Sequence, residues 1–437
     1  MSLLKIQGPC RIKGRLSLPG DKSIAHRLVI LSSISLNSTL IKNFPLNDDC
    51  ISTLRAFKSL GAKIAVYPRE KQVKIQGKGL RGFKKPSLSI FAAESGTTLR
   101  LLLGVLSGQS LNTKLTCARS LSQRPMLRVT QPLRKMGAKI YGRKNLQKEE
   151  FPPFLIQGNK LTAITYKMPI ASAQVKSAIL LAGLYAQGVT RVIEPVKSRD
   201  HTERLLKAFG ARIKIRAGQV LIKGGKELLS PGEFYVPGDI SSAAFFLVLA
   251  AITVDSKIVL KNVSLNPSRA GIIRVLKRMG ANIKVTRHMS QVTKYEPMGD
   301  IEVKSSQLKG TAIKKSEIPS LIDELPVLMV AACFARGKSY FQKVGELRVK
   351  ETDRIKSMLE NLRKMGADIQ VTGSEDIVIN PQGWLRGAKV KSYGDHRTAM
   401  SMIIAGLAAS GTTTIDDTTC ISKSFPDFLK VLKAIIK

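Results

Sequence analysis

Clusters of cations, carboxylates and hydroxyls stand directly before apolar stretches of this sequence. In the first cluster, Lys22 and Ser23 are followed by Arg27 and then by the apolar run 28–31. The pattern predicts a helix with Ser23 as its N-cap and with Arg27 one turn further on the same face. A helix N-terminus attracts negative charge because its first N–H groups are unpaired. The cluster therefore predicts a binding site for an anion.

Seven further segments share this design. They are residues 94–98, 171–176, 198–201, 323–326, 347–354, 395–397 and 423–426. Each segment alone is typical of an ordinary capped helix with solvated charges. Their recurrence in both halves of the chain favours one electropositive site, provided that the helix starts face a common cleft. Such a site suits substrates with several phosphate and carboxylate groups.

The segment 347–354 is the densest of these clusters. The apolar positions that follow it keep helical spacing, which would place Lys350 and Arg354 one turn apart on a polar face. Glu351 stands beside both cations, which would keep its carboxylate ionised or poise it as a base. The alternative interpretation is a solvated ladder of i,i+4 charges.

The elements that position these clusters follow an internal repeat. A helical pattern that ends in a glycine and continues as a strand occurs at Gly61, Gly137, Gly210, Gly280 and Gly366. Apolar helices that end near Gly108, Gly188, Gly337 and Gly411 interleave with these. A glycine in that position is typical of a helix C-terminus. Each repeat therefore alternates strand and helix twice, and residues 428–436 predict a sixth helix of the first kind.

The two halves of the chain also resemble each other. Pro19-Gly20-Asp21 returns as Pro237-Gly238-Asp239, close to three repeats later. The repeats predict an α/β fold of two domains with three repeats each. Residues 1–20 plus 241–437 would form one domain and residues 21–240 the other, because three repeats must close on themselves.

The composition limits the class of function. The chain of 437 residues has 71 Lys and Arg against 31 Asp and Glu, a formal net charge of +40 that suits an anionic partner. The basic residues are spread along the whole chain and only 5% of residues are aromatic, so nucleic-acid binding is the weaker alternative. No apolar run reaches the ~18 residues of a membrane span, and no secretory signal pattern precedes the first repeat.

Five cysteines are scattered without a CxxC pair. They are Cys10, Cys50, Cys117, Cys333 and Cys420. Their number and spacing argue against a disulfide framework and against a structural zinc site. We therefore expect a protein of the reducing cytoplasm.

Together, the motifs resemble the 5-enolpyruvylshikimate-3-phosphate synthase family from about Leu18 to Asp427. The most specific matches are residues 19–27, 171–174, 198–204, 347–355 and 395–397. The resemblance implies two domains, each of three βαβαββ units around a pseudo-threefold axis, with an active site in the cleft between them. It implies that the 5-hydroxyl of shikimate 3-phosphate adds to C2 of phosphoenolpyruvate, after which phosphate leaves. It further implies a monomer that needs no metal or cofactor and binds neither nucleic acid nor membrane.

The resemblance also assigns roles to individual residues. Shikimate 3-phosphate would be bound by Lys22, Ser23, Arg27, Ser172, Ala173, Gln174, Arg199, Asp323 and Lys350. Phosphoenolpyruvate would be bound by Lys22, Gly96, Arg124, Gln174, Arg354, His396, Arg397 and Lys423. Asp323 would accept the hydroxyl proton, while Glu351 and Lys22 would manage protons at the methylene carbon and the bridging oxygen. The arginines would neutralise the phosphate and carboxylate of the tetrahedral intermediate.

Three places depart from the pattern of that family, and the first is Ala25, which replaces a common serine. Ala93-Glu94 stands where the family usually has Gly-Asn, and Gly394 stands where it has Asn or Asp. An extra carboxylate near an anion site should weaken phosphoenolpyruvate binding unless it pairs with a cation or points away.

The nearest alternative is the UDP-N-acetylglucosamine enolpyruvyl transferase family, which shares the architecture. That family places a reactive cysteine ahead of an Arg-Pro pair, and here Cys117 precedes Arg124-Pro125. The spacing is longer than in that family, and Ser23 follows Lys22 where that family has asparagine. We therefore interpret Cys117 as a cysteine without a catalytic role.

Overall fold

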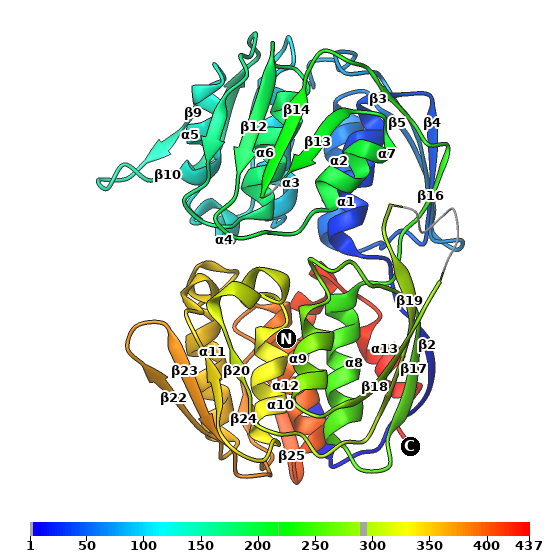
Figure 1. The fold of residues 1–437 in the computed structure, drawn as a ribbon, viewed down its shortest axis with the longest axis vertical. Coiled ribbons are helices and arrows are strands. Elements are labelled where there is room, and N and C mark those ends of the chain that lie inside the picture. Colours follow the sequence, from blue (N-terminus) through cyan, green and yellow to red (C-terminus); the bar gives the residue numbers. More distant parts are fainter. Residues whose placement is uncertain (1–2, 217, 289–294) are drawn as a thin grey trace. The chain divides into compact units, whose positions relative to one another are not determined.

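The computed structural model describes residues 3–216, 218–288 and 295–437. The chain divides into two compact units. Unit 1 consists of residues 1–19 and 237–437, and unit 2 of residues 20–236. Within each unit, small sheets lie around a set of central helices (Figure 1). This is the α/β fold of repeated strand and helix units that the sequence predicts.

In unit 2, three four-stranded sheets lie around the central helices (Figure 1). Their strands are β4 (Ser38–Lys42), β5 (Lys63–Tyr67), β6 (Gln72–Gln76), β7 (Ile90–Phe91), β8 (Asn112–Thr116), β9 (Lys139–Lys144), β10 (Glu150–Gln157), β11 (Thr165–Lys167), β12 (Val189–Ile193), β13 (Arg212–Arg216), β14 (Gln219–Lys223) and β16 (Glu233–Tyr235). The orders are β16-β4-β6-β5, β7-β8-β10-β9 and β11-β12-β14-β13. In each sheet the first pair is parallel and the other pairs are antiparallel. A short parallel pair, β3 (Ser35–Leu36) with β15 (Leu228–Leu229), completes the unit.

Unit 1 repeats this plan. Its strands are β1 (Leu4–Gly8), β2 (Lys13–Ser17), β17 (Lys257–Ser264), β18 (Asn282–Arg287), β19 (Met298–Lys304), β20 (Ala312–Ile313), β21 (Ser339–Phe341), β22 (Asp368–Thr372), β23 (Asp376–Asn380), β24 (Lys389–Val390) and β25 (Gly411–Ile415). The sheet orders are β18-β19-β17-β2, β20-β21-β23-β22 and β1-β25-β24. Because β1 pairs with β25 and β2 with β17, the N-terminal strands complete sheets of the C-terminal half.

Six inner helices form the cores of the two units. They are α1 (Lys22–Ser33), α3 (Gly96–Ser107) and α6 (Ala173–Gly183) in unit 2, and α8 (Ile240–Ile252), α10 (Leu325–Cys333) and α12 (His396–Ala408) in unit 1. Nearly every residue of these helices is buried. A helix that is apolar on all sides belongs inside a core, so only the helix ends remain available for polar chemistry.

Six outer helices each lead into a strand or end the chain. They are α2 (Asp48–Ser59), α5 (Leu127–Lys135), α7 (His201–Ala208), α9 (Gly271–Arg278), α11 (Arg354–Lys364) and α13 (Phe428–Lys433). The five repeat glycines that follow the first five have φ between +74° and +98°. This left-handed conformation confirms the predicted helix, glycine and strand repeat. The sixth helix exists but ends at Lys433, before the predicted boundary.

The described ranges also contain four short helical segments. They are α4 (Arg119–Ser122) and the 3-10 turns η2 (Lys315–Ser320), η3 (Gly345–Val349) and η4 (Thr419–Lys423). No helix in the described ranges is long and apolar enough to cross a membrane.

Two local predictions are wrong. The N-cap of α1 is Asp21 rather than Ser23, because the Asp21 carboxylate accepts from the backbone N–H of Ile24 at 3.1 Å and starts the helix two residues earlier. Residues 350–353 are not helical, because Asp353 caps α11 and accepts from two of its N–H groups. Lys350 therefore lies in the loop before α11, and not on a helix face beside Arg354.

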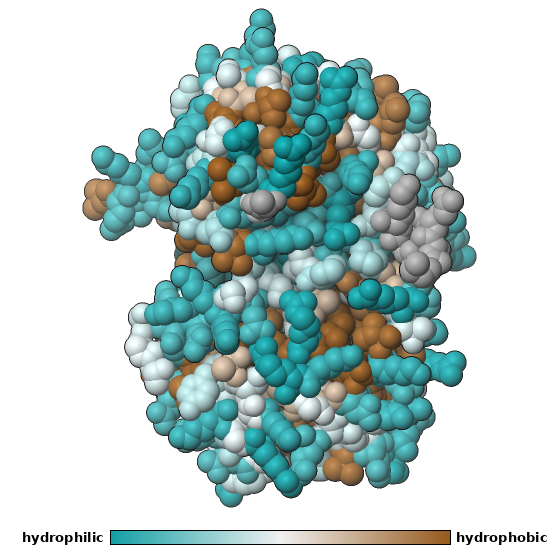
Figure 2. All heavy atoms as spheres, in the orientation of Figure 1, coloured by the Kyte–Doolittle hydropathy of each residue, from teal (hydrophilic) through white to brown (hydrophobic). Residues whose placement is uncertain are grey.

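The positive charge lies mostly on solvent-facing positions. On β6 and β8, the exposed Lys74 and Lys114 alternate with buried neighbours. Figure 2 shows hydrophilic residues over most of the viewed face of each unit, with apolar patches between them. Much of the basic excess is therefore an ordinary solvated surface.

The packing of α3 against α6 gives a test of the unit 2 core. A Cβ on Gly104 would lie 2.3 Å from the carbonyl oxygen of Ala178. We expect Gly104→Ala to lower the free energy of unfolding by about 1–3 kcal/mol, because backbone must move to admit the methyl group. This loss should appear in urea denaturation despite the ~1 kcal/mol by which alanine favours a helix over glycine.

The control is Lys58→Ala at an exposed position of α2, which should change the free energy of unfolding by less than about 0.5 kcal/mol. Wild-type stability of Gly104→Ala would contradict the close approach of the two helices.

Candidate active site

Lys22 opens α1 and is fixed by a carboxylate of α2. Its Nζ lies 2.8 Å from Asp49 Oδ2, and both side chains are mostly buried. Asp49 lies in the first turn of α2, where a negative charge also stabilises the helix. The ammonium is thus held at the N-terminus of α1, a position suited to an anionic ligand.

Arg27 lies one turn further along α1 and is buried. Its Nε donates to Thr202 Oγ1 at 2.6 Å, and its Nη2 donates to Ser177 Oγ at 2.8 Å. Its Nη1 donates to the carbonyl oxygen of Ser23 at 2.9 Å. These contacts hold the guanidinium in one orientation and join the start of α1 to α6 and α7.

His26 supports the same region as a neutral group. Burial, together with the nearby charges of Lys22 and Arg27, lowers its pKa well below the ordinary value. Its Nδ1 lies 2.6 Å from Thr53 Oγ1, and Thr53 Oγ1 lies 2.6 Å from Thr98 Oγ1. The chain of polar contacts connects α1, α2 and α3.

The start of α3 brings Gly96 close to two arginines. A Cβ on Gly96 would lie 2.7 Å from Arg100 Nη1 and 3.3 Å from Arg124 Nη1. Arg100 Nη1 also donates to Gln174 Oε1 at 2.7 Å, and Gln174 Nε2 donates to Thr97 Oγ1 at 2.9 Å. Gly96, Arg124 and Gln174 therefore lie together, and glycine leaves room for the guanidinium groups beside the helix start.

The other predicted residues of unit 2 also lie at helix starts. Ser172 is the N-cap of α6, with its Oγ accepting from the Val175 N–H at 3.4 Å, and Ala173 is the first residue of that helix. Arg199 directly precedes Asp200, the N-cap residue of α7. The contacts of Arg27 with α6 and α7 link these two helix starts.

In unit 1, Arg354 is a buried hub at the start of α11. Its Nε lies 2.8 Å from Asp395 Oδ2, its Nη2 lies 2.6 Å from Glu351 Oε2, and its Nη1 lies 3.4 Å from Asp323 Oδ1. Burial lowers the pKa of Arg354, but the three carboxylates outweigh this effect and raise it. The guanidinium thus brings together the starts of α10, α11 and α12.

Asp323 lies between two guanidinium groups. Besides Arg354, it faces Arg269 Nη1, which is 3.9 Å from Asp323 Oδ2. Arg269 is buried and also donates to Ser241 Oγ at 2.6 Å and lies 3.3 Å from Glu324 Oε1. Two cations favour the ionised form of a carboxylate that is still about one-fifth exposed.

Lys350 and Glu351 lie in the loop before α11. Burial lowers the pKa of Lys350 to about 8, although the nearby Asp323 carboxylate raises it. Glu351 is 30% exposed and paired with Arg354. The loop thus places Lys350, which changes charge near pH 8, beside the partly exposed carboxylate of Glu351.

The start of α12 supplies another cationic group. Asp395 caps the helix and accepts from the Arg397 N–H at 2.7 Å, which places His396 and Arg397 in the first turn. Both side chains are buried, and Arg397 Nε has no hydrogen-bond partner among the described residues. Lys423 Nζ donates to the carbonyl oxygen of Gly394 at 3.2 Å, directly before this helix.

Two of the departures from the family pattern, Gly394 and Glu94, have local explanations. Gly394 has φ +66°, which glycine adopts without strain, and a Cβ there would meet open space. Glu94 Oε1 accepts from Ser120 Oγ of α4 at 2.8 Å, which turns one carboxylate oxygen toward that short helix. The weakening of phosphoenolpyruvate binding by Glu94 stays a prediction.

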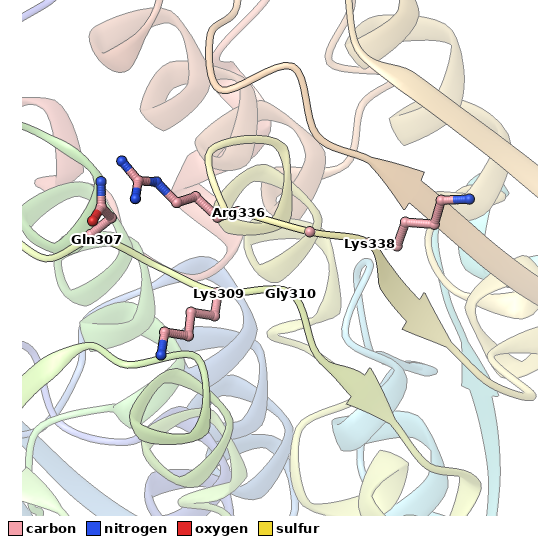
Figure 3. Close-up of a pocket in the computed structure, with 6 residues that line it drawn as sticks. Gln307, Lys309, Gly310, Arg336 and Lys338 are labelled. Atoms are coloured by element: carbon pink, nitrogen blue, oxygen red, sulfur yellow. The ribbon is translucent and has the colours of Figure 1, made fainter.

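A separate pocket lies at the far end of α10. It is lined by Gln307, Lys309, Gly310, Arg336, Gly337 and Lys338. Lys309, Arg336 and Lys338 point in different directions (Figure 3). The pocket follows the C-terminus of α10, a helix about 13 Å long whose other end faces Asp323, and its diverging cations do not form an anion site.

Two residues of these networks were missed by the sequence analysis. Arg100 is four residues after Gly96, the same spacing as Ser23 to Arg27, so this signal was present. Arg269 had no local signal, because its carboxylate partner Glu324 lies far along the chain. Within the described ranges, no group of three or more His, Cys, Asp or Glu residues could hold a metal ion.

Known proteins resemble this chain over almost its whole length. The family model of EPSP synthase (3-phosphoshikimate 1-carboxyvinyltransferase) matches residues 6–432. The 3-phosphoshikimate 1-carboxyvinyltransferase of Petrotoga mobilis is 48% identical over 427 residues, 97% of each chain. That of Desulforamulus reducens is 46% identical over 426 residues, 98% of this chain and 97% of its own. A solved structure of EPSP synthase from Acinetobacter baumannii has a TM-score of 0.87 and 40% identity, and it covers 100% of this chain and 99% of its own.

These matches do not favour the UDP-N-acetylglucosamine alternative, and the state of Cys117 provides a direct test. Burial raises the pKa of this thiol to about 11, against the lowering effect of Arg143. We expect iodoacetamide at pH 7.5 to label Cys117 at least about 100-fold more slowly than it labels an unstructured cysteine, because the thiolate is the reactive form. Mass spectrometry of labelled peptides measures this rate.

The matched variant Cys117→Ser should keep enzyme activity. Rapid labelling of Cys117, together with loss of activity in the serine variant, would contradict our interpretation and favour a reactive-cysteine enzyme.

Proposed function

The chain belongs to the EPSP synthase family, and from this premise we propose how its residues share the work of the reaction. The protein transfers the enolpyruvyl group of phosphoenolpyruvate to the 5-hydroxyl of shikimate 3-phosphate and releases phosphate, a step of aromatic amino acid biosynthesis. The observation that carries the proposal is the set of buried cations at helix starts, each held by side chains of other helices. We propose that the clusters of both units act on the same pair of substrates.

Shikimate 3-phosphate would be bound mainly by the hydrogen-bonded cluster of unit 2. Lys22 and Arg27 supply positive charge at the start of α1, and Arg199 supplies it before α7. The helix starts at Ser23 and at Ser172–Gln174 offer hydroxyl, backbone N–H and amide groups to the ring hydroxyls and the phosphate. Asp323 and Lys350 of unit 1 would complete this set.

Phosphoenolpyruvate carries a phosphate and a carboxylate, and we propose arginine partners for both. Arg124 beside Gly96 belongs to unit 2, whereas Arg354 and Arg397 belong to unit 1. A buried guanidinium with an unpartnered Nε, as in Arg397, is well suited to a carboxylate or a phosphate. Lys22, Gln174, His396 and Lys423 would add further contacts.

The carboxylates divide the proton transfers. Asp323, held ionised by Arg269 and Arg354, would accept the proton of the 5-hydroxyl as its oxygen bonds to C2. Glu351 and Lys22 would deliver a proton to C3 and assist the bridging oxygen. Elimination then returns a proton from C3 to Glu351 while the bond from C2 to the phosphate oxygen breaks beside Lys22, and this restores the double bond as phosphate leaves. The surrounding arginines stabilise the charge of the intermediate.

We also propose that the protein acts as a monomer in the cytoplasm. The five cysteines are free, as suits a reducing compartment. Analytical ultracentrifugation with and without the substrates tests the proposed monomer.

Phosphate release with each substrate omitted in turn is the central functional test. We expect release only when shikimate 3-phosphate and phosphoenolpyruvate are both present. Lys22→Ala, Asp323→Ala and Glu351→Ala should each lower kcat by about 100-fold or more, because each removes a proposed proton donor or acceptor. Lys74→Ala on the exposed face of β6 is the control and should keep wild-type kcat.

Release that proceeds with UDP-N-acetylglucosamine would move the assignment to the other enolpyruvyl transferase family. Wild-type rates in all three alanine variants would instead contradict the proposed roles and leave the reaction in place.

Lys350 predicts a pH dependence of substrate binding. Because its pKa is lowered to about 8, the free protein carries this charge below pH 8 and loses it above. A phosphate ester is already a dianion there, with its second pKa near ~6. We expect the Kd of shikimate 3-phosphate to rise by about tenfold for each pH unit above the pKa, as measured by calorimetry between pH 7 and 9.

Lys350→Gln should bind shikimate 3-phosphate more weakly at pH 7 and show a flatter profile. A wild-type Kd that stays constant from pH 7 to 9 would contradict a role for Lys350 in holding the phosphate.

A further inference from the structure

A buried ion cluster lies behind the start of α6. Lys176 Nζ lies 2.8 Å from Glu194 Oε2 and 2.6 Å from Glu203 Oε1. The Lys176 side chain is 0% exposed, and those of Glu194 and Glu203 are 4% and 2% exposed. The lysine therefore cannot touch a ligand, and its charge must act through the residues around it.

Glu194 connects this cluster to the segment that carries Arg199. Its Oε1 accepts from the backbone N–H of Ser198 at 3.2 Å and also from the Ser198 hydroxyl. One carboxylate oxygen thus closes the turn between β12 and α7, while the other contacts Lys176. The position of Arg199, next in sequence to Ser198, depends on this turn.

Glu203 connects the cluster to the partners of Arg27. It lies in the first turn of α7, directly after Thr202. Thr202 Oγ1 accepts from Arg27 Nε and lies 2.6 Å from Ser177 Oγ. Lys176 itself is two residues after Gln174 and one before Ser177. The ammonium therefore ties together the three segments that carry Gln174, Arg199 and the contacts of Arg27.

We propose that Lys176, with Glu194 and Glu203, is a positioning residue that sets the geometry of the shikimate 3-phosphate site. The proposal rests on the function proposed above, in which Arg27, Gln174 and Arg199 bind that substrate. Residues that hold ligand-binding groups from behind control affinity because small displacements of those groups weaken binding strongly.

The charges of the cluster predict which of its variants should be more damaging. One ammonium stands between two carboxylates, which raise the pKa of Lys176 although burial lowers it. Burial raises the pKa of Glu203 in spite of Lys176. Lys176→Met leaves two carboxylates facing each other in the interior, whereas Glu203→Gln leaves a balanced pair of Lys176 with Glu194. The lysine variant should therefore be much more damaging than the Glu203 variant.

The experiment is calorimetric titration of shikimate 3-phosphate into the full chain without phosphoenolpyruvate. We expect Lys176→Met to raise the Kd by at least about tenfold and Glu203→Gln to raise it by less than about threefold. The matched control is Glu150→Gln, which removes another buried carboxylate of unit 2, paired with Arg134 at 2.7 Å. This variant should lower Tm and leave the Kd unchanged.

Steady-state kinetics separates positioning from general loosening of unit 2. Of the residues proposed to bind phosphoenolpyruvate, Gln174 lies on the same helix start as Lys176, whereas Gly96 and Arg124 lie at the start of α3 and Arg354 and Arg397 belong to unit 1. Lys176→Met should therefore raise KM for shikimate 3-phosphate by a larger factor than KM for phosphoenolpyruvate, because only one of these four phosphoenolpyruvate segments is held by the cluster. An equal rise in both would show a merely structural role and overturn the proposal.

A folded Lys176→Met protein that binds shikimate 3-phosphate within about threefold of wild type would also overturn the proposal. If this variant does not fold, Glu194→Gln is measured instead, with the same limit on the change in Kd. An amide has one acceptor oxygen, which cannot replace the two carboxylate oxygens that accept from Lys176 and from Ser198. Arg199→Ala tests the proposed binding site separately from the positioning role of Lys176. If the Kd of Arg199→Ala for shikimate 3-phosphate equals that of wild type, the proposed binding site is wrong. If Arg199→Ala binds this substrate weakly and Lys176→Met binds it normally, only the positioning role is rejected.

Discussion

Each unit depends on keeping positive charge buried at the starts of its helices. A buried cation that loses its partners is strongly destabilising, so every such group needs a fixed set of acceptors. Arg27 obtains two hydroxyls and a carbonyl oxygen, and Arg354 obtains three carboxylates. Since most of these acceptors lie on other helices or at their starts, the contacts that stabilise the core also fix the orientation of the cations. A ligand with phosphate and carboxylate groups then meets charges that are already in place.

The two units place different chemistry at their helix starts. In unit 2, the contacts of Arg27 and Arg100 include hydroxyl and amide oxygens, which suits the binding of a polyhydroxylated phosphate ester. In unit 1, Asp323 and Glu351 contact Arg354 and remain partly exposed, which suits the transfer of protons. This division explains why one three-repeat plan serves both units while the side chains at the helix starts differ.

The repeat, its glycines and most helix starts could be predicted from the sequence because their signals are local. Asp21 and Ser23 are both capping residues two positions apart, and only the structure shows that Asp21 begins α1. The contacts of Arg27 with Ser177 and Thr202 span 150 and 175 residues, so no pattern within one segment could reveal them. The same holds for Arg269, whose acceptors Ser241 and Glu324 come from two other helices.

The most direct test of a shared role for both units is hydrogen–deuterium exchange with and without saturating shikimate 3-phosphate. The account predicts slower amide exchange in residues 22–27 and 172–177 of unit 2 and also in residues 347–355 of unit 1. Slower exchange confined to one unit would contradict the claim that helix starts of both units hold the same ligand.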